Sequence, residues 1–443
     1  MHKVMKKCCL LISCFLIGIC TLVAQDSNQV RKYICDLSAP EMQGRGYAYN
    51  GDSIAAEYIR AQYQRMGIEP FGSPDYYDRY GFNVYQMEGP TTVILDKKKL
   101  TPWQDYALAP FSKSAQASYN IQPVKLADLL DQDRLLMICK SVEKKLSKTL
   151  FYVDLTKCSD KDTLTKVNRM FQWLSKYNGS FPFQGFIVGV KDIPVWSFNA
   201  AHESCDYILM YVHPESVTEK TKKVYLSYSN VLKYHKTQNV CAQIKGVVEP
   251  DSFIVVGGHY DHLGRMGDEV LFPGAHDNAS GTAAILDMAQ YFKNHPPYYT
   301  MVFTSFSGEE AGLLGSFAFV KDSLLDFSKI KMMLNMDLVC GGTEGFTVVN
   351  ATGDNTKDFY QSLVDINEKE SLVKTVKPRA NAANSDHYPF VAKGIPAVFV
   401  YVMGGKTGGY HQPDDTCANC TLEAYDGIVR LLIKGLEGIG SRQ

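Results

Sequence analysis

The chain has 443 residues, with 46 Lys and Arg against 47 Asp and Glu, and therefore no basic excess. This balance excludes the electrostatic attraction that brings basic proteins to nucleic acids or to anionic membrane surfaces. The length exceeds one ordinary hydrophobic core and fits two domains, or one large domain that carries an insertion.

The pattern of residues 1–24 predicts a secretory signal peptide, because three lysines precede an apolar run from Cys8 to Val23, and we expect cleavage after Ala24. The apolar run is shorter than the roughly 20 residues that cross a bilayer, which disfavours a retained membrane anchor. A lipoprotein signal around Cys14 is disfavoured because too little apolar sequence precedes it. We therefore expect a secreted or periplasmic protein with no membrane span after cleavage.

Eight cysteines follow this leader, and only Cys417 and Cys420 form a C-x₂-C pair. A structural zinc site built from such motifs needs two pairs. In an exported protein the single pair predicts a local disulfide between Cys417 and Cys420.

Residues 28–70 have a helical pattern in which Ile54, Tyr58 and Ala61 share one face, and Gly67 is a typical helix end. The segment 37–46, which contains Pro and Gly, predicts a surface turn. From about residue 80 to 224, short β-like runs (92–95, 135–139, 150–155, 185–190 and 207–212) surround one helix at 161–177. No cluster of ligand-type side chains occurs there, so we expect an accessory β-rich domain.

From residue 239 onward, β and α segments alternate, which predicts an α/β fold with a mostly parallel sheet flanked by helices. We expect strands at 240–244, 253–257, 300–306, 332–336, 346–349 and 397–401. Helices are expected at 281–294, with Ser280 as the N-cap, and at 359–369 and 422–439.

Ligand-type side chains follow the ends of these strands, where open α/β sheets carry their chemistry. The candidate metal ligands are His259, Asp277, Glu310, Asp337 and His411. Imidazole and carboxylate together suit zinc better than calcium or magnesium. Five ligands suffice for two metals that share one carboxylate, and Asp277 is the candidate bridge because it lies between the other pairs in chain order.

Two further carboxylates receive catalytic roles from their positions. Adjacent side chains on an extended segment point to opposite sides, so Glu309 can face the attacking water while Glu310 binds metal. Asp261 lies two residues after His259 and on the same side, where it can accept a hydrogen bond from the ring nitrogen that faces away from the metal.

The motifs Gly258-His259-Tyr260-Asp261, 274–281, 307–310, 335–337 and 410–416 resemble those of a zinc-dependent exopeptidase family. Bacterial leucyl aminopeptidase and aminopeptidase Y typify this family, and glutamate carboxypeptidase, the transferrin receptor and the glutaminyl cyclases are relatives. The likeness covers residues 32–71 and 239–439. It implies the zinc exopeptidase fold and peptide substrates with a free N-terminus.

By this resemblance, one zinc would take His259, Asp277 and Asp337, and a second would take Asp277, Glu310 and His411. Glu309 would be the general base and then the acid.

The resemblance also implies a catalytic domain built from residues 25–79 and 231–443. Residues 80–230 would be an inserted domain similar to the protease-associated β domain. His276 stands where relatives often have Asp or Asn, and we interpret it as a bystander. His262 is interpreted as structural or as a support for a ligand.

An exported aminopeptidase with two zincs is the leading hypothesis. A glutaminyl-peptide cyclotransferase would use one zinc, whereas the set here is sufficient for two. A dipeptide or glutamate-type carboxypeptidase needs a cation for the substrate carboxylate, and Arg379 is the nearest candidate. A receptor-like binding module is disfavoured because such relatives lose ligands, whereas all five and Glu309 are present here.

Overall fold

The computed structural model describes residues 27–176, 183–197, 204–217, 220–321, 325–405 and 408–440. The predicted signal peptide lies outside these ranges. Within them, no helix combines the length and the apolar character that crossing a membrane requires.

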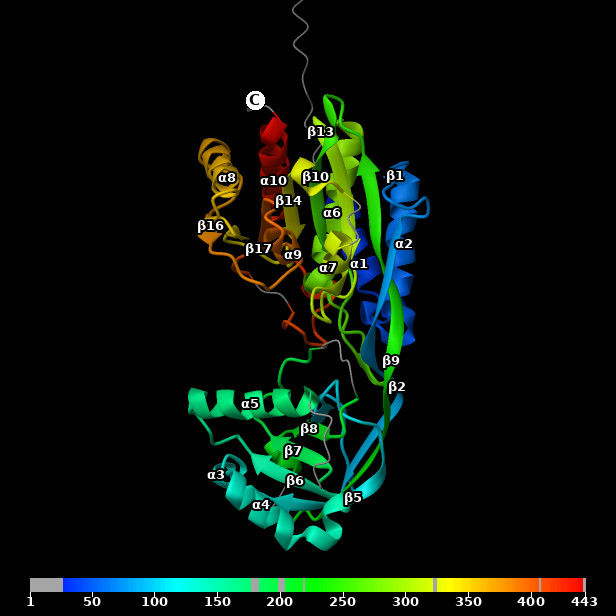
Figure 1. The fold of residues 1–443 in the computed structure, drawn as a ribbon, viewed down its shortest axis with the longest axis vertical. Helices are drawn as coiled ribbons and strands as arrows, with labels where there is room; N and C mark the ends of the chain where they lie inside the picture. The colour runs from blue at the N-terminus through cyan, green and yellow to red at the C-terminus, as the bar shows by residue number, and fades with distance from the viewer. Residues whose placement is uncertain are drawn as a thin grey trace, which may run out of the picture.

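The largest sheet is mixed and mostly parallel in its upper part, with helices on both sides (Figure 1). Its upper strands run in the order β16 (Val376–Arg379), β15 (Phe346–Val349), β17 (Ala397–Val402), β14 (Ile330–Met336), β10 (Glu249–His259), β13 (Tyr299–Phe306) and β9 (Lys223–Ile244). β10 is parallel to both β13 and β14, and β14 is parallel to β17. This arrangement confirms the predicted fold class.

Both faces of the upper sheet are buried under helices, as expected for parallel strands. Along β10, Ile254 and Val256 pack into one core with α1 (Ser27–Leu37), α2 (Gly51–Met66), α6 (Ser280–Asn294), α8 (Lys357–Glu370) and α10 (Tyr425–Gly440). Val255 points to the opposite face, where α7 (Leu314–Lys321) and α9 (Tyr388–Ala392) cover a second core. Successive residues of a strand face opposite sides, so one strand serves both cores.

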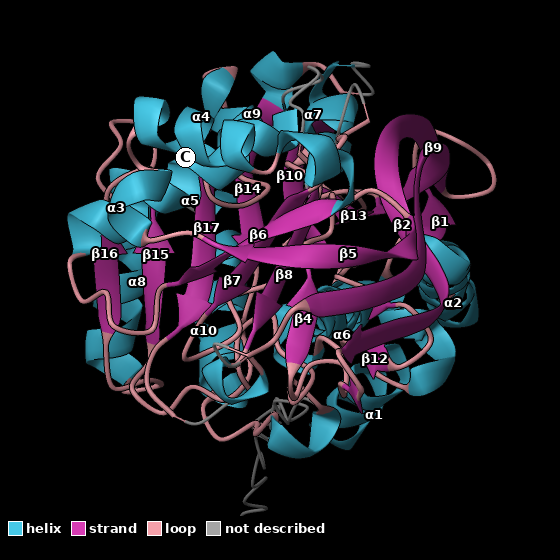
Figure 2. Ribbon diagram, turned by 90° about the horizontal axis from the view of Figure 1, so that it is seen from below, coloured by secondary structure: helices cyan, strands magenta, loops and turns pink. Residues whose placement is uncertain are grey.

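A second part of the molecule, formed by the described residues of 96–222, lies below the upper sheet in Figure 1 and in front of it in Figure 2, which is seen from below; it is called the lower lobe here. Its strands are β3 (Lys98–Lys99), β4 (Tyr106–Leu108), β5 (Ala115–Pro123), β6 (Thr149–Asp154), β7 (Gly185–Gly189) and β8 (Ile208–Val212). Its helices are α3 (Leu126–Leu129), α4 (Gln132–Ser141) and α5 (Lys161–Lys176).

A long antiparallel ladder joins the two parts. β2 (Tyr77–Leu95) pairs with β9 along almost its whole length, and β9 then pairs with β13 above and with β5 below. The predicted domain boundaries at 79/80 and 230/231 therefore fall inside two continuous strands.

Two sequence interpretations of helices and strands are wrong for local reasons. The run 135–139, predicted as a strand, lies in α4, because Asp131 accepts a hydrogen bond from the backbone NH of Arg134 and starts a helix. In α2 the buried face contains Ala55, Ala56, Ile59 and Tyr63, whereas Ile54 is 40% exposed.

Ser280 also differs from its prediction as an N-cap. It lies inside the helical turn, where its hydroxyl donates to the carbonyl of His276 and accepts from the backbone NH of Val339. The hydroxyl therefore ties α6 to the segment after β14. Gly67, in contrast, ends α2 with φ of 64°, as predicted.

The predicted disulfide between Cys417 and Cys420 is wrong. Cys417 is bonded to Cys35 of α1, and Cys420 is bonded to Cys340, which follows β14. Cys417 begins a 3-10 turn and Cys420 follows it, so each reaches a different neighbour. The two bridges fasten the C-terminal segment to the N-terminal helix and to the end of a central strand.

Candidate metal centre

The strands bring five candidate ligands to one edge of the upper sheet. His259 ends β10 and lies opposite Phe306, the last residue of β13, so the Glu309-Glu310 pair follows beside it. Asp337 follows β14 directly, and Asp277 lies in the turn that precedes α6. His411 comes from the segment between β17 and α10.

The ligand atoms form two groups that share Asp277. His259 Nε2 lies 3.4 Å from Asp277 Oδ1 and 3.3 Å from Asp337 Oδ1. His411 Nε2 lies 3.1 Å from Asp277 Oδ2 and 3.3 Å from Glu310 Oε2. The two oxygens of one carboxylate are thus divided between the groups.

These residues fit zinc on grounds of geometry and of hydrogen bonding. Ligand atoms about 2.1 Å from a tetrahedral zinc stand about 3.4 Å apart, close to the separations found here. Among the described residues, His411 Nε2 and Asp337 Oδ1 are buried without a hydrogen-bond partner. Buried polar atoms rarely remain unpaired, so a cation is the fitting partner.

The pKa shifts of the two candidate histidine ligands also indicate that the cluster favours bound positive charge. Burial disfavours the charged form of His411, but the carboxylates of Glu310 and Asp277 outweigh it and raise the pKa to about 11. Burial also opposes protonation of His259, and Asp337 and Glu309 again raise its pKa well above the ordinary value. The cluster therefore holds an excess of negative charge that bound cations would balance.

The orientation of His259 differs from the prediction. Its Nδ1 lies 3.1 Å from the backbone carbonyl of Asp261 and 3.8 Å from the Asp261 carboxylate. The carboxylate instead accepts hydrogen bonds from the Tyr47 hydroxyl and from the backbone NH groups of Glu309 and Glu310. Asp261 therefore orients the imidazole through its main chain, and its side chain holds the Glu309-Glu310 turn.

Other groups fix the remaining ligands. His262 Nδ1 lies 2.8 Å from Glu310 Oε1, which makes His262 a support for a candidate ligand. Ser385 Oγ donates to Asp337 Oδ2 at 2.9 Å. His276 points elsewhere, with its Nδ1 3.5 Å from Cys340 Sγ.

Besides Tyr47 and Ser385, two buried residues that support the site are missing from the sequence-based set. Arg45 is fully buried and donates to the carbonyls of Tyr260, Pro273, Gly274 and Asp277. Burial lowers the pKa of its guanidinium to about 10. Its segment was predicted to be a surface turn. A charged side chain between two glycines at 44 and 46 was the available signal, because such glycines permit close backbone contact.

Asp415 is the second such residue. It accepts hydrogen bonds from the backbone NH groups of His276 and Asp277 at 2.8 and 3.0 Å. It follows His411 by four residues, so one segment supplies both a candidate ligand and a support for the shared carboxylate.

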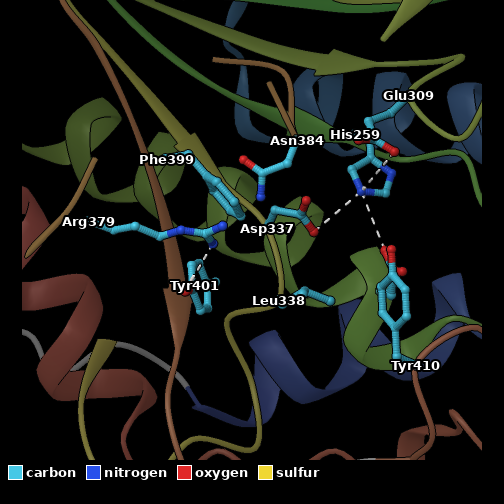
Figure 3. A pocket seen from close by; sticks show the side chains of 10 residues that line it. His259, Glu309, Asp337, Leu338, Arg379, Asn384, Phe399, Tyr401 and Tyr410 are labelled. Atoms are coloured by element: carbon cyan, nitrogen blue, oxygen red, sulfur yellow. Dashed lines mark hydrogen bonds and ion pairs between the residues drawn. The ribbon is translucent and has the colours of Figure 1, made fainter. Parts of the chain in front are cut away.

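A cavity of about 280 Å³ opens beside this cluster (Figure 3). It is lined by His259, Asp277, Glu309, Asp337, Leu338, Arg379, Asn384, Phe399, Tyr401 and Tyr410. Glu309 lies on the opposite side of the cavity from Arg379. Burial raises the pKa of Glu309 well above its usual value, as expected for a carboxyl group that exchanges a proton during a reaction.

Several known proteins resemble this chain in sequence. Residues 239–435 match Peptidase family M28, which confirms the predicted resemblance to zinc exopeptidases in that part of the chain. A probable leucine aminopeptidase of Arthroderma otae is 31% identical over 190 residues, which are 41% of this chain and 52% of the relative. The probable glutamate carboxypeptidase VP8 of Zea mays is 31% identical over 218 residues, which are 44% of this chain and 28% of that protein.

Solved structures agree with the whole fold. A zinc aminopeptidase from Bacillus subtilis aligns with a TM-score of 0.65 at 18% identity, covering 94% of each chain. A Peptidase M28 precursor from Shewanella amazonensis aligns with a TM-score of 0.66 at 17% identity, also covering 94% of each chain. The curated relatives are matched over about half of their length or less.

Proposed function

We propose, from the match of residues 239–435 to Peptidase family M28, that the protein is an exported zinc aminopeptidase. The observation that carries the proposal is the division of the Asp277 oxygens between His259 and His411. Such an arrangement suits two cations that share one carboxylate. His259, Asp277 and Asp337 would hold one zinc, and Asp277, Glu310 and His411 would hold the other.

Zinc, when bound, polarises a substrate carbonyl and lowers the pKa of water. The chain's own contribution to proton transfer comes from Glu309, whose carboxylate borders the cavity. Glu309 takes a proton from the attacking water and delivers it to the leaving amine. The Asp261 carboxylate holds the backbone NH of Glu309 and thereby positions the base.

The cavity wall supports peptides as the substrate class. Phe399, Tyr401 and Leu338 offer apolar surface for the N-terminal side chain, and Arg379 offers one cation. The Arg379 guanidinium lies 3.3 Å from the Tyr401 hydroxyl, its one hydrogen bond found among the described residues. An N-terminal residue with a carboxylate would meet this cation, so acidic as well as apolar N-termini are candidate substrates.

Export to an oxidising compartment is part of the proposal. The bridges Cys35–Cys417 and Cys340–Cys420 support it, because disulfides persist in secreted and periplasmic proteins and are rare in the cytosol. We also propose that residues 80–230 form an inserted domain of protease-associated type.

The test is a panel of aminoacyl and N-blocked peptide substrates, assayed with and without a chelator, together with the zinc content of the protein. We expect hydrolysis of free N-termini alone, about two zincs per chain and loss of activity on chelation. Glu309→Gln should lower kcat by about 10²–10⁴-fold while zinc content stays unchanged. Binding of one zinc per chain together with pyroglutamate formation would establish the cyclotransferase alternative. Cleavage of N-blocked peptides at their C-terminus would establish the carboxypeptidase alternative.

A further inference from the structure

His411 lies where the candidate metal centre meets the lower lobe. Its Nδ1 is 3.0 Å from the backbone carbonyl of Trp196 and 3.2 Å from the hydroxyl of Ser197. A proton on Nδ1 that is donated to this carbonyl leaves the lone pair on Nε2, which faces Asp277 and Glu310. The lower lobe therefore selects the ring form of His411 that can bind a metal.

The Trp196 carbonyl is itself held by an aromatic clamp, defined here as Trp103, Trp196 and Phe272. The Trp196 and Phe272 rings are stacked with centroids 4.9 Å apart and an interplanar angle of 7°. Trp103 meets Phe272 edge to face, also at 4.9 Å. Trp196 Nε1 donates to the carbonyl of Leu108 at 2.7 Å, so a hydrogen bond as well as stacking fixes the indole.

The clamp spans the two parts of the molecule. Trp103 and Trp196 belong to the lower lobe, whereas Phe272 belongs to the segment between β10 and α6 and is fully buried. Trp103 Nε1 also donates to Gln412 Oε1 at 3.1 Å, beside His411 in the chain. Two independent contacts thus connect the lower lobe to the His411 segment.

The two candidate ligand groups differ in where the carbonyl that orients their histidine comes from. His259 is oriented by the carbonyl of Asp261, which belongs to the same end of β10. His411 depends on a carbonyl that is 215 residues away in sequence. Movement of the lower lobe would therefore change one half of the centre and leave the other half in place.

We propose that the lower lobe completes the candidate metal centre, with Trp196 as a positioning residue for His411. The aromatic clamp holds the Trp196 carbonyl against Nδ1, and loading of the His411 group with metal depends on that contact. This inference rests on the proposed function for the identity of the metal. It goes beyond that function by giving the lower lobe a role at the metal centre.

We expect substitution of Trp196 to weaken the binding of one zinc and not of the other. Loss of an outer partner of a metal-binding histidine typically reduces metal affinity about 10- to 100-fold. Trp196→Ala removes the stack on Phe272 and the bond to Leu108, so the 196 carbonyl loses its support. Trp196→Phe keeps an aromatic ring on Phe272 but loses the bond to Leu108, and an intermediate effect follows.

The experiment measures zinc affinity on the full chain by competition with a chromophoric chelator, beginning from metal-free protein. Trp173→Phe is the matched control, because Trp173 is the one tryptophan of the chain outside the aromatic clamp, lies on α5 and is 52% exposed. The control should bind two zincs with the same affinities as the wild type. Trp196→Ala should bind one zinc normally and the other about 10- to 100-fold more weakly.

A second readout uses the tryptophans themselves. In the Trp173→Phe background, both remaining indoles belong to the aromatic clamp, so their emission reports its environment. Emission should change on addition of the zinc equivalent that fills the His411 group and not of the equivalent that fills the His259 group. If Trp196→Ala fails to fold, Trp103→Phe provides the affinity test, because it removes only the contact to Gln412 and part of the edge-to-face pair.

The outcomes separate this inference from the proposed function. Two equally tight zincs in a folded Trp196→Ala, or equal weakening of both, would overturn the positioning role. If Trp103→Phe is the variant tested, unchanged affinity for both zincs would also overturn the positioning role. Wild-type protein that binds no zinc or cleaves no substrate would instead refute the proposed function.

Discussion

Removal of the Cys340–Cys420 bridge should destabilise the protein strongly. The bridge closes a loop with a sequence separation of 80 residues, for which the chain-entropy relation gives a contribution of about 4.5 kcal/mol. The double variant Cys340→Ala, Cys420→Ala should lose an amount of this order from its free energy of unfolding. The measurement is urea denaturation under non-reducing conditions, followed by tryptophan fluorescence and circular dichroism.

The matching comparison is the Cys35–Cys417 bridge, whose separation of 382 residues gives about 6 kcal/mol by the same relation. Cys158→Ser serves as the control, since that thiol is free. Because Cys340 follows Asp337 by three residues, zinc affinity should fall in the first variant as well. A loss below about 1 kcal/mol in both double variants would refute the reasoning that these bridges restrict the unfolded chain.

Three further predictions concern single side chains. Arg45→Met should cost about 3–5 kcal/mol in thermal unfolding, because several buried carbonyls lose their charged donor, whereas Arg60→Met on the surface should change little. Burial lowers the pKa of His387 to about 4, so the unfolded chain, with a His pKa of about 6.5, binds its proton first as pH falls. Stability should therefore drop by up to about 3 kcal/mol between pH 6.5 and 4, and denaturation of His387→Leu across this range should show a smaller drop. Arg379→Met should lower kcat/KM for N-terminal Glu about tenfold and leave N-terminal Leu unchanged; equal effects on both substrates would exclude a carboxylate contact.

Sequence reasoning succeeded where one pattern had one structural solution. The apolar runs of β10, β13 and β14 are buried except for Phe253, which is partly buried, and their carboxyl ends must meet at one edge, so His259 and Asp337 could be placed together. The run 135–139 failed because five apolar residues fit a strand or a helix turn equally well. Asp131, which precedes the run, caps the N-terminus of a helix, and the run therefore forms a helix and not a strand.

Contacts between distant segments were beyond reach for a different reason. Nothing near residue 196 in the sequence indicates that its carbonyl meets His411, since a backbone acceptor has no compositional signal. The partners of Cys417 and Cys420 depend on where α1 and the end of β14 lie in space. The same holds for Asp261, whose main-chain carbonyl orients His259 in place of the expected carboxylate, while the carboxylate holds the Glu309-Glu310 turn.

The β2–β9 ladder has a consequence for the cooperativity of the molecule. β9 contributes Val224 and Leu226 to a core shared with the lower lobe, and Val240 and Ala242 to the core of the upper sheet. At about 3.3 Å per residue, its 22 residues extend about 70 Å without interruption. Neither core can lose this strand without exposing part of the other, so the two parts should melt together. The lower lobe is inserted between β2 and β9, at the end of this ladder that lies far from the upper sheet. Residues inserted there leave the pairing of β9 with β13 unchanged, and with it the residues that these strands position.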